Sequence, residues 1–597
     1  MSVIELGDSI PSLTSHAVSV SLPTWADNVG YEEGDKRVVD KMSTGYPRFF
    51  IHKSIGALAD AIIARYGSAN QKAMLFPSTA SAHRCRDFIK AKGEPSLTKD
   101  VEVIDLILDK GKESSEIVMK ISPSISAVTY HSDLFPVAKQ YWQHSGDGIS
   151  SRRAEFCHSL FSDGKLVAAA TPQPVIPQKK GPRRYQRGSI DLTSSPTDNK
   201  VSPERVEDAA EIQESTQFLE DRFGRNLDIS FIDNAKVSLR RRIAGSLTGE
   251  VNLATIESNS PENTSNSHGV TQDDVYLYPC GMNAIFSTHR MLLQSRGQLK
   301  SISFGFPYVD TLKILQKFGP GCIFYGHGSS EDLDDLEARL QAGERYLALF
   351  CEFPGNPLLK CPDLKRIKKL ADTYDFAVVV DDTIGTSINV HVLPYADVVV
   401  SSLTKIFSGD CNVMGGSAIL NPQGRYYDSL KKAYEADQTN NNNYWAEDII
   451  FMERNSRDFI NRIKKINHTT EAICDLLRGH PLVKDVYYPK YSSTKQFYED
   501  CRTPEGGYGG LLSFFFHKKE HAIAFYDRIE TAKGPSLGTN FTLTSPYVLL
   551  AHYWELDWAG GFGVPPDLIR VSVGVEDTEE LVSRFVVALK AAEGVDS

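Results

Sequence analysis

The 597-residue chain has no long apolar run, no paired-cysteine motif and no excess of basic residues. No uninterrupted apolar stretch approaches the ~20 residues that cross a bilayer, so we expect no membrane partner. Nine cysteines without a Cys-x-x-Cys pair argue against a disulfide framework or a zinc site and fit reduced thiols. The formal charge of −11 argues against a nucleic-acid partner. No targeting segment is recognisable at the start, so the sequence predicts a cytoplasmic protein. The cysteine pattern also predicts that the protein holds no metal.

The chain is longer than one hydrophobic core usually serves, which predicts several domains. Apolar periodicity weakens between residues 166 and 216, where Pro, Ser, Gln, Lys and Asp dominate, so we predict a flexible linker there. The predicted parts are an N-terminal extension domain of unassigned role (1–165), this linker (166–216) and two further domains (217–425 and 426–597). The linker carries basic side chains that form either a nuclear-localisation or anionic docking patch or, as we favour, a solvated disordered run: Lys179, Lys180, Arg183, Arg184 and Arg187.

Strand and helix patterns alternate in the second half of the chain. Before the linker, the patterns predict helices at 55–66 and 80–91 and a strand at 116–121. After it, they predict strands at 346–351, 376–380 and 398–400 and a helix at 363–374. Strands separated by crossover helices imply an α/β fold with a mainly parallel sheet covered on both faces. Ligands of such sheets bind at the carboxyl ends of the strands.

Two of these strands end in side chains with complementary chemistry. The strand at 398–400 leads into Ser402-Leu403-Thr404-Lys405, and the strand at 376–380 ends at Asp381. A lysine can hold an aldehyde cofactor as a Schiff base, while a neighbouring carboxylate keeps a pyridine nitrogen protonated. Either residue alone would be read as a surface lysine or a helix cap. Together they predict pyridoxal 5′-phosphate as the cofactor.

Further candidates follow other predicted strands. Asn356, in Glu352-Phe353-Pro354-Gly355-Asn356-Pro357, would reach the same sheet edge, although this segment also reads as a proline-bounded turn. Gly281 and Met282 begin a helical pattern and offer backbone amides to a phosphate. Tyr308 is a candidate for stacking on the cofactor ring, although a tyrosine at such a place is more often simply packed.

The order of these motifs resembles the cysteine and methionine metabolism family of pyridoxal phosphate enzymes, from about Phe218 to Ala592. The matching segments are 352–357, Val380-Asp381-Asp382-Thr383, 402–405, 509–514 and 568–577. The segments 18–25 and 45–50 are similar to the extended amino-terminal region of fungal cystathionine γ-synthases, a group within this family. The resemblance implies the aspartate aminotransferase-like fold of pyridoxal phosphate transferases, with the cofactor in the 217–425 domain, a smaller C-terminal α+β domain and an extra N-terminal region.

The resemblance also implies roles for individual residues. Lys405 would be the Schiff-base lysine, Asp381 the pyridinium partner with Thr383 beside it, and Tyr308 the stacking residue that assists the leaving group. The phosphate would be bound by Gly281, Met282, Ser402, Thr404 and, from a neighbouring subunit, Arg225. An arginine that acts in trans implies a homodimer or homotetramer.

On the substrate side, Arg570 would bind the α-carboxylate, a task suited to a planar guanidinium, with Asn356 and Ser536 as helpers. Without the resemblance, Arg225 and Arg570 would be read as surface salt-bridge partners and Ser536 as a loop hydroxyl.

The function implied is γ-replacement on amino-acid substrates, in which cysteine displaces the acyl group of an O-acylhomoserine and forms cystathionine, a transsulfuration step of methionine biosynthesis. Two departures from the family pattern keep other acceptors open: Val309-Asp310 replaces a glycine pair, and Phe541 replaces the glutamate usually found shortly after the segment at 536–539. Sulfide or a carbon nucleophile would then be the acceptor, or a γ-lyase reaction would need none. A non-catalytic regulatory or scaffolding protein is the alternative of a different class.

Overall fold

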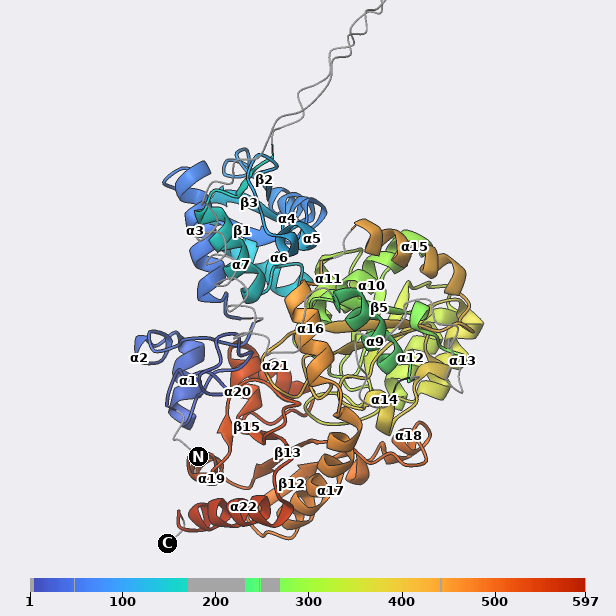
Figure 1. Cartoon of the computed structure of the whole chain (residues 1–597). Helices are drawn as coiled ribbons and strands as arrows, with labels where there is room; N and C mark the ends of the chain where they lie inside the picture. The colour runs from blue at the N-terminus through green and yellow to red at the C-terminus, as the bar shows by residue number, and fades with distance from the viewer. Residues whose placement is uncertain are drawn as a thin grey trace, which may run out of the picture.

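The computed structural model describes residues 5–47, 49–169, 231–245, 247, 269–440 and 443–595. They form three β-sheets covered by helices (Figure 1). Most of the predicted linker, and Arg225 with the N-terminal edge of the third predicted part, lies outside the described residues. The first linker residues, Leu166–Ala168, form strand β4 of the N-terminal sheet. The division into four parts stays a prediction.

The N-terminal sheet is antiparallel throughout, in the order β1-β3-β2-β4. Its other strands are β1 (Gln71–Phe76), β2 (Glu102–Leu108) and β3 (Ile125–His131), and its helices are α3 (Lys53–Tyr66), α4 (Thr79–Lys92), α6 (Phe135–Ser145) and α7 (Ser151–Ser162). Helices α3 and α4 confirm the predictions at 55–66 and 80–91.

The strand predicted at 116–121 is wrong, because these residues form helix α5 (Glu116–Ile121). Ser115 caps this helix by accepting a hydrogen bond from the amide of Val118 at 3.4 Å. Ile117 and Ile121, four residues apart, lie on one helix face and pack against a core cluster beneath. The short apolar run is compatible with the periodicity of a helix or of a strand, and the cap provided by Ser115 favours the helix.

The central sheet has seven strands in the order β5-β11-β10-β9-β8-β6-β7. Their bounds are β5 (Val275–Tyr278), β6 (Ser301–Phe304), β7 (Cys322–Tyr325), β8 (Ala348–Glu352), β9 (Ala377–Asp381), β10 (Val398–Ser402) and β11 (Gly416–Leu420). Only β11 runs antiparallel to its neighbours, which confirms the predicted mainly parallel sheet.

Both faces of the central sheet are buried, which explains its continuous apolar strands. Along β9, Val379 packs into a cluster with α10 (Gly281–Arg296), while Val378 and Val380 face the opposite cluster with α12 (Ser330–Gln341) and α13 (Leu364–Tyr374). Successive side chains of a strand point to opposite faces, so helices on both sides need apolar residues at every position. The strand ends are left to carry polar residues.

The C-terminal sheet is mixed, with the order β12-β13-β16-β15-β14 and one parallel pair, β14–β15. Its strands are β12 (Val483–Tyr487), β13 (Leu511–Phe516), β14 (Ala532–Lys533), β15 (Leu543–Ser545) and β16 (Ile569–Ser572), and its helices include α17 (Phe459–Arg478), α19 (Lys519–Arg528) and α22 (Thr578–Glu593). This sheet and its helices form the smaller α+β unit that the sequence predicted.

The remaining helices connect these units. They are α9 (Ile232–Ile243), α11 (Val309–Lys317), α14 (Thr386–Asn389), α15 (Tyr427–Asn440), α16 (Ala446–Asn455), α18 (Lys495–Glu499), α20 (Tyr547–Ala551) and α21 (Leu556–Gly561). In the part of the chain that the structure describes, no helix has the length and apolar character to cross a membrane.

Residues 5–47, which we call the N-terminal arm, pack against the C-terminal part of the chain. The arm includes α1 (Trp25–Glu33), which lies beside α20 in Figure 1, and α2 (Lys36–Val39). The amide of Leu22 donates to the carbonyl of Lys533 at 3.0 Å, and the amide of Trp25 donates to the Asp527 carboxylate at 2.7 Å. The N-terminal arm therefore docks on the C-terminal sheet and its helices rather than standing apart from them.

Candidate active site

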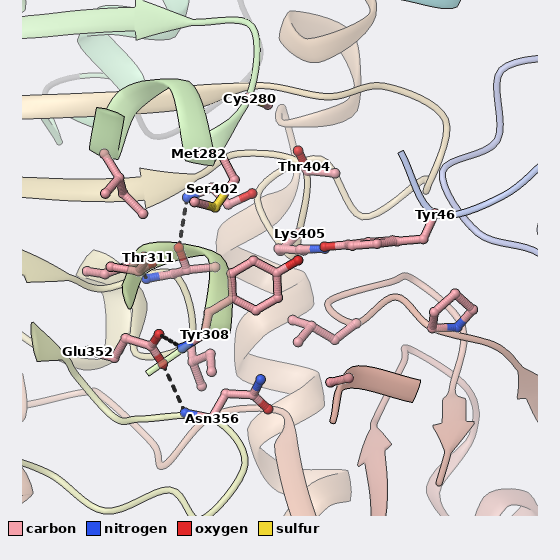
Figure 2. A pocket seen from close by; sticks show the side chains of 18 of the residues that line it. Tyr46, Cys280, Met282, Tyr308, Thr311, Glu352, Asn356, Ser402, Thr404 and Lys405 are labelled. Carbon is pink, nitrogen blue, oxygen red and sulfur yellow. Dashed lines mark hydrogen bonds between the residues drawn. The ribbon is translucent and has the colours of Figure 1, made fainter. Parts of the chain in front are cut away.

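One pocket at the carboxyl ends of β8, β9 and β10 gathers most of the predicted site residues (Figure 2). Its lining includes Gly281, Met282, Tyr308, Asn356, Asp381, Thr383, Ser402, Thr404, Lys405 and Arg570. Ser536 is buried directly behind the lining residues Pro535 and Leu537. Arg225 lies outside the described residues.

Lys405 is buried at the centre of this pocket, three residues beyond β10. Its Nζ donates a hydrogen bond to the hydroxyl of Tyr46 at 3.0 Å. Gly538 passes close over the lysine with φ of 67°, and a Cβ on Gly538 would lie 2.8 Å from the Lys405 Cβ. Only glycine adopts that conformation and approaches so closely without strain. The turn that contains Gly538 therefore packs directly against Lys405 and restricts its position.

Two buried carboxylates lie side by side at the same sheet edge. Asp381 ends β9 and pairs in register with Glu352 at the end of β8. Burial raises the pKa of both carboxyl groups, and the charge of Asp381 raises the pKa of Glu352 further. Among the described residues, no cationic side chain forms an ion pair with either. The pair therefore fits a bound cation, and the protonated ring nitrogen of pyridoxal phosphate is a cation of the right kind.

Hydrogen bonds from backbone amides connect the strand ends around these carboxylates. The amide of Thr383 donates to Asp381 Oδ1 at 2.9 Å, and the amide of Ser402 donates to Thr383 Oγ1 at 2.8 Å. Thr383 thus links the aspartate strand to the lysine strand. The Thr404 hydroxyl accepts the Gly415 amide at 3.1 Å, so it holds the loop that follows Lys405 as well as lining the pocket.

The start of α10 provides a cradle suited to a phosphate. Its N-cap residue, Cys280, makes no side-chain capping bond, which leaves the first-turn amides, including those of Gly281 and Met282, available for an anion. A Cβ on Gly281 would lie 2.7 Å from the Ser402 Cβ, so glycine allows the helix start to approach the lysine strand. These residues fit the phosphate end of the cofactor.

Arg570 lies on β16 and brings a buried positive charge to the opposite wall. Its guanidinium donates to Asn356 Oδ1 at 3.3 Å and to the carbonyl of Ser536 at 2.9 Å, and it lies 4.2 Å from the ring centroid of Tyr547. Burial lowers the pKa of this guanidinium. Among the described residues, no carboxylate pairs with it, so the site fits an incoming carboxylate. Ser536 contacts Arg570 through its carbonyl oxygen.

Three further residues contact the site without having been predicted from the sequence: Glu352, Tyr547 and Tyr46. Glu352 accepts hydrogen bonds from the backbone amides of Tyr308 and Asn356, and its place at the end of a predicted strand was a usable signal. The Tyr547 hydroxyl accepts a hydrogen bond from the Asn356 amide nitrogen at 2.9 Å. Tyr46 comes from the N-terminal arm, and no local pattern points from it to the pocket.

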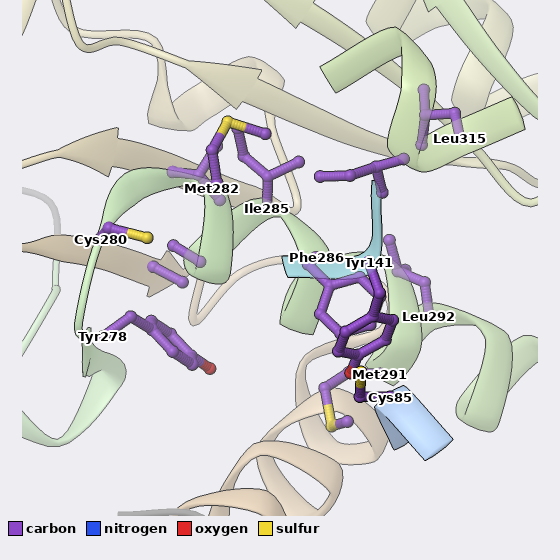
Figure 3. Close-up of a cluster of buried hydrophobic side chains, with 14 of the residues drawn as sticks. Cys85, Tyr141, Tyr278, Cys280, Met282, Ile285, Phe286, Met291, Leu292 and Leu315 are labelled. Carbon is purple, nitrogen blue, oxygen red and sulfur yellow. The ribbon is translucent and has the colours of Figure 1, made fainter. Parts of the chain in front are cut away.

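The N-terminal sheet and its helices support the two helices that begin at the site. Cys85 and Tyr141 share a buried cluster with Phe286, Met291 and Leu292 of α10 (Figure 3). Polar contacts join the same surfaces: Asn283 of α10 donates to Asp147 at 2.8 Å, and Gln143 donates to Asp310 of α11 at 3.1 Å. Asp310 belongs to the pair that departs from the family pattern. Its contact links the residues after Tyr308 to the N-terminal region.

Comparisons with known proteins agree with this geometry. Residues 270–590 match the model of the Cys/Met metabolism PLP-dependent enzyme family. The chain belongs to this family. Residues 54–150 match the N-terminal domain of fungal trans-sulfuration enzymes, which confirms the predicted relationship of the N-terminal region.

Relatives of the family cover the whole length of the chain. The cystathionine gamma-synthase of Neurospora crassa is 56% identical, with 99% of each chain covered. That of Saccharomyces cerevisiae is 38% identical, again with 99% of each covered. A cystathionine gamma-synthase-like enzyme of Amanita muscaria is 40% identical over 99% of this chain and 97% of its own. The protein is therefore a pyridoxal phosphate-dependent enzyme of this family.

Proposed function

We propose that the protein catalyses γ-replacement on an O-acylhomoserine, with cysteine as the incoming nucleophile. The cysteine sulfur forms a bond to Cγ, the Cγ–O bond breaks, and the products are cystathionine and the free carboxylic acid. The observation that carries this proposal is that Lys405 and Arg570 face one pocket with the Asp381–Glu352 carboxylates, in a chain 56% identical to a cystathionine gamma-synthase.

Each wall of the pocket has a separate task. Arg570 binds the substrate α-carboxylate, and Asn356, held by Tyr547, orients the guanidinium. Pyridoxal phosphate supplies the electron sink when bound, held by Asp381 at its ring nitrogen and by the α10 start at its phosphate. The Lys405 amine moves protons at the substrate Cα and Cβ, which lets the acyl group leave from Cγ. The Tyr308 ring, which lines the same pocket, would stack on the cofactor.

The test is a product assay with O-acetyl- and O-succinylhomoserine, each with and without cysteine. We expect cystathionine to form only when cysteine is present, at a rate well above that of ketoacid and ammonia release. Release of ketoacid at the same rate with and without cysteine would indicate a γ-lyase. A further arm replaces cysteine by sulfide, and faster formation of the thiol homocysteine there than of cystathionine with cysteine would indicate a sulfhydrylase.

We further propose a homodimer or homotetramer in which Arg225 contacts the cofactor phosphate of a neighbouring subunit. The described pocket lining supports this, since its basic residues, Lys405 and Arg570, both have other tasks. Light scattering after size-exclusion chromatography would give the mass of the assembly. An Arg225→Ala chain should bind pyridoxal phosphate more weakly, and a monomer that retains the cofactor would contradict the proposal.

We also propose a cytoplasmic location. All nine cysteines are free, and eight of them are buried. Free thiols throughout a chain of this size are suited to a reducing compartment. Fluorescence microscopy of the tagged full-length chain tests the location, and a nuclear signal would point to the basic segment between residues 179 and 187.

A further inference from the structure

Tyr46 reaches the pocket from a segment 359 residues before the lysine it contacts. Its hydroxyl oxygen lies 3.0 Å from Lys405 Nζ, and its ring centroid lies 4.8 Å from the same atom. In Figure 2 the tyrosine comes from the N-terminal arm toward the end of Lys405, while Tyr308 approaches from α11. The lysine therefore lies between one tyrosine of the central domain and one of the extension.

A tight turn holds the Tyr46 side chain in this position. The amides of Phe49 and Phe50 both donate to the Tyr46 carbonyl, at 2.9 and 3.0 Å. A Cβ on Gly45 would lie 2.5 Å from the Phe50 Cβ, so the chain folds back on itself at a point where only glycine fits. The Phe49 ring packs against the Tyr46 ring with centroids 5.6 Å apart. The phenol is thus preorganised rather than free to swing.

The arm is anchored to the loop that carries the lysine. The amide of Val18 donates to the carbonyl of Cys411 at 2.9 Å, and the Thr44 hydroxyl donates to the carbonyl of Ala17 at 3.0 Å. Cys411 follows Lys405 by six residues. Through these two bonds the backbone before Tyr46 is tied to the loop after Lys405.

We propose that Tyr46 is a catalytic residue that stabilises the protonated amine of Lys405 during turnover. The inference rests on the proposed function, in which the freed amine takes a proton from a substrate carbon and becomes an ammonium ion. The Tyr46 oxygen accepts a hydrogen bond from that ammonium, and the aromatic face attracts its charge. The amine returns the proton to the substrate at a later step.

A catalytic Tyr46 needs its hydroxyl group, whereas a Tyr46 that only lines the pocket needs just its ring. Tyr46→Phe keeps the ring and removes the oxygen that accepts the hydrogen bond from the ammonium ion, so this variant separates the two roles. Tyr46→Leu removes both the oxygen and the aromatic face. Tyr31 in α1 is a matched control, because it belongs to the same arm, packs against the cluster of Leu22 and Val38, and does not itself line the pocket.

The experiment compares Tyr46→Phe, Tyr46→Leu and Tyr31→Phe as full-length holoenzymes. We expect kcat to fall about 10-fold in Tyr46→Phe and further in Tyr46→Leu, with the KM for O-acylhomoserine within about 3-fold of the wild type. The visible absorbance of the lysine-bound cofactor should titrate with a midpoint moved by at least about 0.5 pH unit in Tyr46→Phe. Tyr31→Phe should match the wild type in both measurements.

Each outcome decides the assignment. A Tyr46→Phe enzyme with wild-type kcat and titration overturns it, even when Tyr46→Leu is impaired, because the ring alone then suffices. A Tyr46→Phe chain that fails to fold while Tyr31→Phe folds also overturns it in favour of a structural role. The titration needs no substrate, so it reports on the Tyr46–Lys405 contact even if the wild type forms no cystathionine and the proposed function fails.

Discussion

The carboxylate of Glu352 accepts hydrogen bonds from the backbone amides of both Tyr308 and Asn356. One side chain at the end of β8 therefore positions both Tyr308, the residue proposed to stack on the cofactor, and Asn356, which contacts Arg570. Glu352 reaches both amides from the strand next to Asp381, which places it at the junction of the cofactor and substrate walls.

Glu352→Gln should lower kcat/KM for the O-acylhomoserine by about 10- to 100-fold. One acceptor oxygen becomes an NH2 group, and a buried amide left without an acceptor costs about 1–3 kcal/mol. Steady-state kinetics and thermal unfolding would check this. Glu337→Gln in α12 is the control: it lies outside the pocket lining and loses one ion pair with Arg366, so it should leave the kinetics unchanged and cost at most about 1 kcal/mol of stability. Unchanged kinetics in Glu352→Gln would show that the two amides need no anionic acceptor.

Arg570→Lys should raise the KM for the O-acylhomoserine by about 10- to 100-fold while the visible absorbance of the cofactor persists. A lysine keeps the charge but loses the planar fork that binds a carboxylate through two parallel hydrogen bonds. It also loses the packing on Tyr547. Substrate titrations would measure the effect. An unchanged KM would place the α-carboxylate elsewhere in the pocket.

Asp381→Asn should lower kcat by about 10²- to 10³-fold, because removal of one partner from a buried charge pair costs about 3–5 kcal/mol. Lys405 should still form its Schiff base, so the visible absorbance separates this variant from Lys405→Ala, which should lose it. Asp372→Asn, an exposed aspartate of α13, serves as control. Wild-type turnover in Asp381→Asn would remove the assignment of Asp381 as partner of the ring nitrogen.

Removal of the cofactor should make stability more sensitive to pH. Burial raises the pKa of Asp382 to about 7, and the nearby charge of Asp381 adds to the effect. A carboxyl group whose pKa is raised by folding contributes stability below its unfolded pKa and loses it as pH rises through the folded pKa. The melting temperature of the cofactor-free chain should therefore fall between about pH 4 and pH 7.

The bound cofactor adds a cation near these carboxyl groups, so the holoenzyme should show a smaller decrease over the same range. Differential scanning calorimetry of both forms checks this, and a difference of at least about 2 °C is expected. Asp382→Asn should reduce the decrease in the cofactor-free chain. Equal slopes in all three proteins would show that the buried carboxyl groups are neutralised by other means.

The central sheet and the polar residues at its strand ends could be predicted from the sequence, because a parallel sheet covered on both faces requires continuous apolar strands. The run Val378–Val380 is buried on alternate faces, and the polar residues that follow have no role in the core. The adjacency of Lys405 and Asp381 then follows from the parallel pairing of β9 and β10. These signals are local in the sequence.

The parts that the sequence did not predict depend on contacts between distant segments. Nothing near Tyr46 indicates that it meets Lys405, because packing of the arm on Cys411 and Lys533 determines its place. The helix at 116–121 was decided by one capping serine against an ambiguous apolar run. The contact of the Ser536 carbonyl with Arg570 depends on backbone orientation, which residue type does not encode.

The bond between the amide of Trp25 and Asp527 spans 502 residues. During synthesis, the arm therefore leaves the ribosome long before the C-terminal residues against which it packs. Until those residues are made, apolar side chains of the arm such as Leu22 and Trp25 are exposed. Contacts between such distant segments form slowly, and chains that hold them open are prone to aggregate. A nascent chain of this protein should thus depend on chaperones until its last strands emerge.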